Sequence, residues 1–188
     1  MVQKRVWIIL ADGFEETEAI GTWDALRRAG MEGVELVSIN DTVEVKGAHG
    51  LLLQADTTLN DLPSDLVDAV VLPGGMDGAN NLYAHEGVRT LLKRHHEAGR
   101  LVAAICASPF VLARIGLLDG VRATIYPGLE KELEKAEVVA GPVVTDGNII
   151  TGRGPRYAFH YGVEIVRYLL GDNAANEVAT ALLLKEVL

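Results

Sequence analysis

"LVAAICASPF", residues 101–110, is the segment that decides the fold. Five apolar residues, 101–105, precede Cys106, the single cysteine of the chain, and Pro109 follows three residues later. An apolar run of this length predicts a strand that is buried on both faces. Pro109 is typical of the first turn of a helix, where its missing N–H breaks no hydrogen bond. Cys106 therefore lies at a predicted turn from a buried strand into a helix.

The same alternation of strand and helix extends along the rest of the chain. The predicted strands cover 5–11, 34–40, 66–75, 101–105, 121–127 and 148–152, and the predicted helices cover 15–30, 85–100, 108–118, 155–171 and 173–188. Segment 42–55 predicts a small β-excursion that turns at Gly47 and Gly50, and segment 137–148 predicts a hairpin. Apolar strands that alternate with helices predict a mostly parallel sheet covered on both faces. We expect one doubly wound α/β domain over residues 1–188.

Size and composition exclude several classes of protein. A chain of 188 residues with 49% hydrophobic residues is long and apolar enough to bury a full core. Its net charge of -9 and its lack of a basic cluster argue against nucleic acid or an acidic membrane as the partner. One cysteine forms no intramolecular disulfide and suits a reducing compartment. The apolar run at the N-terminus is too short for a signal or membrane segment, so we expect a cytoplasmic protein.

The predicted architecture indicates where a site would lie. Ligands of open parallel sheets bind beyond the carboxyl ends of the strands. Three such ends carry polar or glycine-rich sequence, namely "ADGFEE" (11–16), "LPGGMDGANN" (72–81) and "ICASP" (105–109).

Cys106 is the first candidate for chemistry. A helix N-terminus and the amides of Ala107 and Ser108 would lower the pKa of its thiol from about 8.5 into the range of about 3.5 to 7.5. That environment predicts a reactive thiolate at a nucleophile elbow, although the flanking glycines of the hydrolase motif are missing. The alternative is an inert cysteine buried among the apolar residues 101–105.

Glu18 is the second candidate. It lies in the first turn of the predicted helix 15–30, where acids are also explained by the helix dipole. It shares a stripe with three small residues, Thr22, Ala25 and Ala29, which predicts close approach of this helix face to the sheet. A carboxyl group buried there needs a partner or a raised pKa. A protonated Glu18 beside the thiolate would donate a hydrogen bond to sulfur and shuttle protons.

The glycine pair of "LPGG" is the third candidate. The Gly75 amide could join that of Ala107 in an oxyanion hole, or the pair could form an ordinary turn at the end of a strand. A phosphate loop is excluded because no G-x-G-x-x-G or G-K-[ST] pattern is present.

The five histidines give no further catalytic or metal pattern. None of them follows a strand end, and His95 and His96 are expected to be solvated on a charged helix. No spacing of His, Cys and acidic residues fits a zinc site, so we predict no metal.

Five motifs, in order along the chain, together resemble the ThiJ/PfpI superfamily, and within it most closely the branch of the Parkinsonism-associated protein deglycase. These motifs are "LADGFEETE" (10–18), "DALRRAG" (24–30), "VVLPGG…GANNL" (70–82), "AAICASP" (103–109) and "TGRGP" (151–155). The resemblance covers essentially the whole chain. It implies a flavodoxin-like three-layer sandwich, a homodimer and no cofactor.

The resemblance also implies roles for particular residues. Cys106 would be the nucleophile, Glu18 a protonated acid bonded to it, and Gly75 and Ala107 backbone donors. The pocket around them would include residues Gly74, Met76, Tyr126, Arg153 and Pro155. Tyr126 stands where some members have a histidine, so a base is missing there, and Met76 makes the pocket more apolar. Ala107 stands where the peptidase branch has a histidine, which argues against peptidase activity.

The expected function follows from the resemblance and the three candidates together. We expect a cysteine-dependent enzyme that acts on reactive carbonyls, either converting methylglyoxal to lactate or removing early glycation adducts. The partner would be a small aldehyde or a glycated substrate. An oxidative-stress sensor or chaperone with an oxidisable cysteine is the alternative, and an amidohydrolase or peptidase is a third reading.

Overall fold

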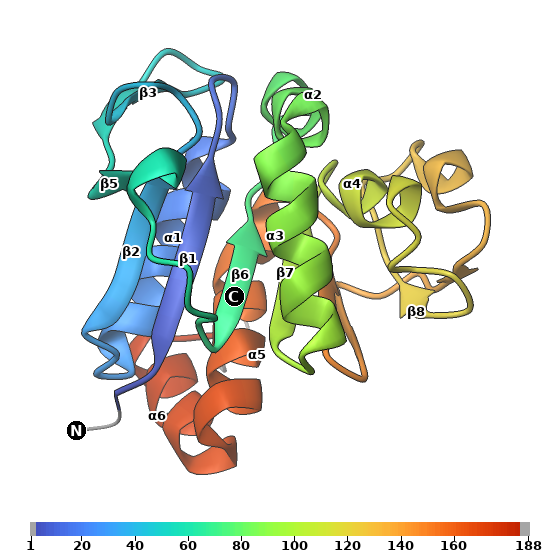
Figure 1. The fold of residues 1–188 in the computed structure, drawn as a ribbon. Helices are drawn as coiled ribbons and strands as arrows, with labels where there is room; N and C mark the ends of the chain where they lie inside the picture. Colours follow the sequence, from blue (N-terminus) through green and yellow to red (C-terminus); the bar gives the residue numbers. More distant parts are fainter. Residues whose placement is uncertain (1–2, 185–188) are drawn as a thin grey trace.

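The computed structural model describes residues 3–184 and contains a central seven-stranded sheet in the order β10-β11-β7-β6-β1-β2-β5 (Figure 1). All neighbouring strands are parallel except β10, which is antiparallel to β11 at one edge. The strands of this sheet are β1 (Arg5–Leu10), β2 (Gly33–Ser38), β5 (Thr57–Thr58), β6 (Ala69–Leu72), β7 (Leu101–Ile105), β10 (Val143–Asp146) and β11 (Ile149–Gly152). The predicted parallel sheet is confirmed.

Helices cover both faces of the sheet, as predicted. One face carries α1 (Glu16–Arg28), α5 (Ala158–Leu170) and α6 (Asp172–Ala181), and the other carries α2 (Met76–Ala84), α3 (Glu86–Glu97) and α4 (Pro109–Arg114). Side chains of β1 alternate between the two cores: Ile8 and Leu10 point to the first, whereas Trp7 and Ile9 point to the second. Three short 3₁₀ turns connect these elements: η1 (Leu59–Asp61), η2 (Glu130–Leu133) and η3 (Pro155–Tyr157). No helix in the described part of the chain combines the length and apolarity that a membrane crossing requires.

The predicted β-excursion is confirmed as a separate hairpin. Strands β3 (Glu44–Lys46) and β4 (Leu52–Gln54) pair antiparallel above the edge of the main sheet (Figure 1). The N–H of Gly47 donates to the carbonyl of Leu51 at 2.7 Å and closes the loop between them. This loop therefore projects toward the carboxyl end of β1.

Two expectations for the strands in the second half of the chain are wrong. The strand predicted over 121–127 is reduced to β8 (Arg122–Ala123), which pairs in parallel with β9 (Glu137–Val138). The hairpin expected within 137–148 does not form, because β9 pairs with β8 and the hairpin instead joins β10 to β11 around Gly147, whose φ is 57°. Left-handed backbone at Gly147 suits this tight turn.

Two predicted helices are shorter than expected. The helix expected over 108–118 ends at Arg114, because Gly116 takes a left-handed φ of 84° that ends helices. The helix expected over 173–188 begins at Asp172 and ends at Ala181, and residues 185–188 lie outside the described residues.

The stripe of small residues on α1 packs against α5, and not against the sheet as predicted. A Cβ on Gly162 would lie 2.7 Å from the Cβ of Ala25, and a Cβ on Gly21 would lie 3.2 Å from that of Ala158. The two helices can approach this closely only because glycine occupies both positions. The α1–α5 joint, defined by these four residues, fixes α1 relative to the segment that leads into α5.

Candidate active site

Cys106 occupies a strained elbow between β7 and α4. Its φ is 64°, in the left-handed region that costs a residue other than glycine about 1–2 kcal/mol. The elbow is held on both sides, because the N–H of Cys106 donates to Gly152 O at 2.9 Å and its carbonyl accepts from Tyr126 N at 2.9 Å. Pro109 is the first residue of α4, as predicted. The residue as a whole is 8% exposed, so Cys106 lies at the edge of the core and not at its centre.

Two backbone amides donate to the sulfur. They belong to Gly75 and Ala107, the two donors predicted for this position. Gly75 reaches it with a φ of 87°, where a Cβ would lie 2.2 Å from Gly13 O. The Ser108 amide, also expected to point at the sulfur, instead donates to Ile105 O at 3.1 Å. The site therefore has one pair of converging N–H donors at Cys106.

Glu18 is fully buried on α1 and hydrogen-bonds the Cys106 thiol. Its Oε2 also accepts from the Gly74 amide at 2.7 Å, and its own N–H donates to Glu15 Oε2 at 2.7 Å. A Cβ on Gly74 would lie 2.5 Å from both Glu18 Oε2 and Cys106 Cβ. Glycine at position 74 is therefore what allows the acid to approach the cysteine.

Burial and charge set the protonation of this pair. Burial, followed by the neighbouring charge of Glu15, raises the pKa of Glu18 from 4.5 to about 8. Glu18 is therefore mainly protonated at neutral pH. Burial, and then the charge and hydrogen bond of an ionised Glu18, raise the pKa of Cys106 from 9.0 to about 12, against the opposing effect of the two amides. The predicted low pKa of the thiol is wrong, because burial outweighs the donors.

Besides Glu15 and the Gly74 amide, the surroundings of Glu18 include two buried hydroxyl groups. Within residues 3–184, the Tyr161 hydroxyl, the Thr22 hydroxyl and Glu18 Oε1 have no nitrogen or oxygen partner. Burial, and then the charge of Glu18, raise the pKa of Tyr161 well above 10. An ionised Glu18 would thus meet no cation on this side, which favours its neutral form.

A cavity of about 240 Å³ lies next to the elbow. Its lining includes Tyr126, Arg153 and Pro155, three of the predicted pocket residues. Arg156 and Tyr157 also line it and were not predicted, because helical spacing alone does not show which residues of a helix start face a cavity. Met76, the first residue of α2, is 46% exposed and does not line this cavity.

The prediction of two solvated histidines is wrong for His95. This side chain is fully buried, and its Nε2 accepts from the Val67 amide at 3.1 Å. Its ring meets that of Trp7 edge-on, with centroids 5.9 Å apart. These contacts bury His95 in the core. The charged residues next to it in the sequence had indicated a solvated side chain. In the described part of the chain, no histidine hydrogen-bonds to Cys106.

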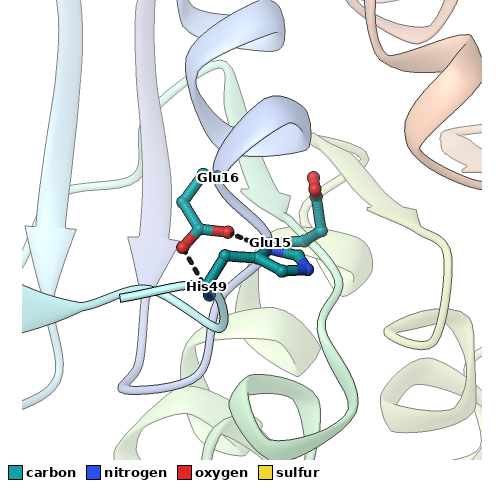
Figure 2. Close-up of side chains that lie close together, drawn as sticks. All are labelled: Glu15, Glu16 and His49. Atoms are coloured by element: carbon teal, nitrogen blue, oxygen red, sulfur yellow. Dashed lines mark hydrogen bonds and ion pairs between the residues drawn. The ribbon is translucent and has the colours of Figure 1, made fainter. Parts of the chain in front are cut away.

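Glu15, Glu16 and His49 lie close together at the start of α1 (Figure 2). One ligand atom from each lies within 4.8 Å of the others, an arrangement that sequence spacing could not show because His49 comes from the loop between β3 and β4. The cluster has a simpler explanation than a metal. Both oxygens of Glu16 bond to His49, one to its backbone N and one to Nδ1, each at 2.6 Å, while Glu15 caps the helix. The prediction of no metal remains a prediction.

Fold and site together define a flavodoxin-like α/β protein with a cysteine at a nucleophile elbow and a buried acid beside it. Residues 4–168 match the DJ-1/PfpI family, and the chain belongs to that family. It is 40% identical over 184 residues to protein dj-1beta of Drosophila melanogaster, which covers 97% of this chain and 98% of that protein. It is 34% identical over 190 residues to the Parkinson disease protein 7 homolog of Danio rerio, which covers 99% and 100%.

Solved structures confirm the predicted flavodoxin-like fold. The crystal structure of Drosophila melanogaster DJ-1beta superposes with a TM-score of 0.93 at 40% identity and covers 97% of this chain and 98% of that one. The structure titled "Toxoplasma gondii DJ-1, oxidized" gives 0.91 at 33% identity and covers 96% and 98%. The resemblance inferred from the five motifs is therefore confirmed.

Proposed function

We propose that this protein is a cysteine-dependent, cofactor-independent enzyme that converts small reactive carbonyls, with methylglyoxal as the model substrate and lactate as the product. One observation carries the proposal: the sulfur of Cys106, a residue that is 8% exposed, lies between two backbone N–H donors and a protonated carboxyl group. These are a nucleophile, an oxyanion hole and a proton shuttle within contact of a single atom.

The chemistry begins when the Cys106 sulfur attacks the aldehyde carbon. A C–S bond forms, the carbonyl oxygen becomes an alkoxide held by the Gly75 and Ala107 amides, and the thiol proton passes to that oxygen, giving a hemithioacetal. The protonated Glu18 donates its proton to the neighbouring ketone oxygen, and its carboxylate then removes the proton from the former aldehyde carbon, giving an enediol. Glu18 delivers that proton to the neighbouring carbon and takes up the proton of the hydroxyl group on the former aldehyde carbon, so the acid is protonated again. The product is a thioester of lactate. Addition of water releases lactate and regenerates the thiol.

The decisive test measures lactate formed from methylglyoxal by wild type, Cys106→Ala and Glu18→Gln. We expect Cys106→Ala to be inactive and Glu18→Gln to lose at least about a hundredfold in turnover, the usual contribution of a general acid–base group. Lys93→Gln, on the exposed surface of α3, is the matched control and should retain full activity. Unchanged lactate formation in Cys106→Ala would show that the mechanism is wrong.

Removal of glycation adducts is the finer form of the same activity. Adducts of methylglyoxal with N-acetylarginine release free methylglyoxal spontaneously, so consumption of the free aldehyde also clears them. Adduct loss should therefore be followed beside the rate of free methylglyoxal consumption. Adduct loss faster than spontaneous release indicates a deglycase, and loss at the spontaneous rate indicates a glyoxalase alone.

An oxidative-stress sensor is the second candidate, and the donors at the sulfur favour it. The Gly75 and Ala107 amides and a protonated Glu18 would donate hydrogen bonds to a sulfinate on Cys106. The related Toxoplasma gondii protein has been solved in a form titled as oxidized. Mass spectrometry after mild peroxide treatment distinguishes the candidates: selective addition of two oxygens at Cys106 in a protein without lactate formation supports the sensor.

A further inference from the structure

Arg153 and Arg156 are two of the three arginines in the described part of the chain whose guanidinium groups have no ion pair or hydrogen bond; Arg122 is the third. Within residues 3–184, neither forms an ion pair or a side-chain hydrogen bond, although the chain has 26 acidic residues and a net charge of -9. Five other arginines pair with carboxylates: Arg5, Arg28, Arg100, Arg114 and Arg167. The two guanidinium groups, three residues apart in the sequence, thus stay without a counterion in an acidic protein.

Both of these arginines line the cavity of about 240 Å³ beside the elbow. Its remaining walls are flat and largely apolar, formed by the rings of two tyrosines and two prolines: Tyr126, Tyr157, Pro127 and Pro155. The Arg156 guanidinium lies 5.9 Å from the centre of the Tyr157 ring, which helps to orient it. Two guanidinium groups beside apolar ring surfaces suit a small molecule with one anionic end.

The cavity borders two segments that hold the backbone of Cys106. Tyr126 forms one wall, and its N–H donates to the carbonyl of Cys106 at 2.9 Å. Arg153 follows Gly152, whose carbonyl accepts the N–H of Cys106 at 2.9 Å. These two backbone contacts place the walls of the cavity next to the elbow.

We propose that Arg153 and Arg156 bind the anionic group, a carboxylate or a phosphate, of a carbonyl substrate whose aldehyde carbon lies at Cys106. The inference rests on the proposed function and names its substrate class. Arginine is suited to this role because its planar fork pairs with two oxygens of a carboxylate or phosphate at once.

The test uses two alkylating agents that need no turnover. Iodoacetate and iodoacetamide form the same C–S bond with Cys106 and release the same iodide, but only iodoacetate carries a negative charge. We expect the rate constant for iodoacetate divided by that for iodoacetamide to fall about threefold in Arg153→Gln and in Arg156→Gln. A change of this size is the effect of losing an exposed charge pair. Arg153→Lys should keep most of the wild-type ratio, and Lys93→Gln, which removes a distant charge, should keep all of it.

A second arm separates the two anionic groups. At equal ionic strength, inorganic phosphate or acetate that occupies the cavity should slow alkylation by iodoacetamide in wild type and not in the double glutamine variant. Protection by phosphate alone assigns a phosphate-bearing substrate, and protection by acetate assigns a carboxylate.

Two outcomes would overturn the inference: an unchanged ratio in the double variant, or an equal fall in Lys93→Gln. These outcomes are independent of the enzyme assay. If no lactate forms but the ratio falls as expected, the anion site stands and the proposed reaction fails. If lactate forms normally and the ratio is unchanged, only the anion site fails.

Discussion

Replacing Glu18 with glutamine should make Cys106 more reactive at alkaline pH and leave it unchanged at neutral pH. The thiol pKa of about 12 applies while Glu18 carries a charge. A unit charge at about 4 Å in surroundings of effective dielectric constant about 20 changes the energy by about 4 kcal/mol, or about 3 pKa units. Beside a neutral residue at position 18, the pKa of the thiol should therefore fall, whereas burial, the largest cause of its rise, remains.

The two proteins then differ with pH in a definite way. At pH 7, Glu18 is mostly protonated because its pKa is about 8. Little of Cys106 is then ionised in either protein. At pH 10, Glu18 holds the single charge of the pair in most wild-type molecules, so a smaller fraction of Cys106 is ionised there than in the variant.

Iodoacetamide alkylation followed by mass spectrometry from pH 6 to 11 measures these fractions. We expect similar rates at pH 7 and a rate several-fold higher for Glu18→Gln at pH 10. Lys93→Gln is the control and should follow wild type throughout. A wild-type rate that is already maximal at pH 7, or a variant that is no faster at pH 10, would refute the idea that acid and thiol share one charge.

Three further predictions concern the support of the site. Gly74→Ala should lower kcat/KM for methylglyoxal by about tenfold or more, because its Cβ would lie 2.5 Å from both the acid and the cysteine. The free energy of unfolding, measured in urea, should be about 1 kcal/mol higher for Cys106→Gly than for Cys106→Ala, because glycine adopts a φ of 64° without strain. His95→Leu should lose about 1–3 kcal/mol of stability at pH 8 in urea denaturation, because the Val67 amide loses its acceptor. That difference should narrow below about pH 6.5. Burial lowers the pKa of His95, so in wild type the unfolded chain takes up the proton first as pH falls.

The parts of the site that follow from strand order could be predicted from the sequence. The carboxyl ends of β1, β6 and β7 meet at one edge because adjacent parallel strands do so, and this brings Glu18, Gly75 and Cys106 together. The elbow itself follows from an apolar run that ends at Cys106 three residues before Pro109. The local sequence pattern was sufficient to predict a feature, such as the elbow, whose determining residues are neighbours in the sequence.

Helix α2 could not be predicted because its stability comes from a distant contact. Its sequence, "MDGANNLYA", contains Gly78 and two asparagines, which are weak helix formers. Gly78 lies against the backbone of Phe14, where a Cβ would be 2.8 Å from nitrogen. That close approach buries Ala79 and Leu82 and stabilises the helix despite its propensities.

The protonation of the site was also beyond the sequence. Helix position alone suggests an acidic thiol, but the thiol pKa depends on burial and on a charge contributed from 88 residues earlier in the chain. His95 shows the same limit, since its place beside Trp7 is fixed by tertiary packing.

The α1–α5 joint links two parts of the site that differ in chemistry. Helix α1 carries the acid, whereas the cavity with its two arginines forms the approach to α5, and glycines at positions 21 and 162 lock the helices together. In the proposed reaction, the distance between the acid and this cavity would set the length of the substrate. A larger residue at Gly162 would change that distance without touching any reacting atom, so substrate length could evolve from a position remote from the chemistry.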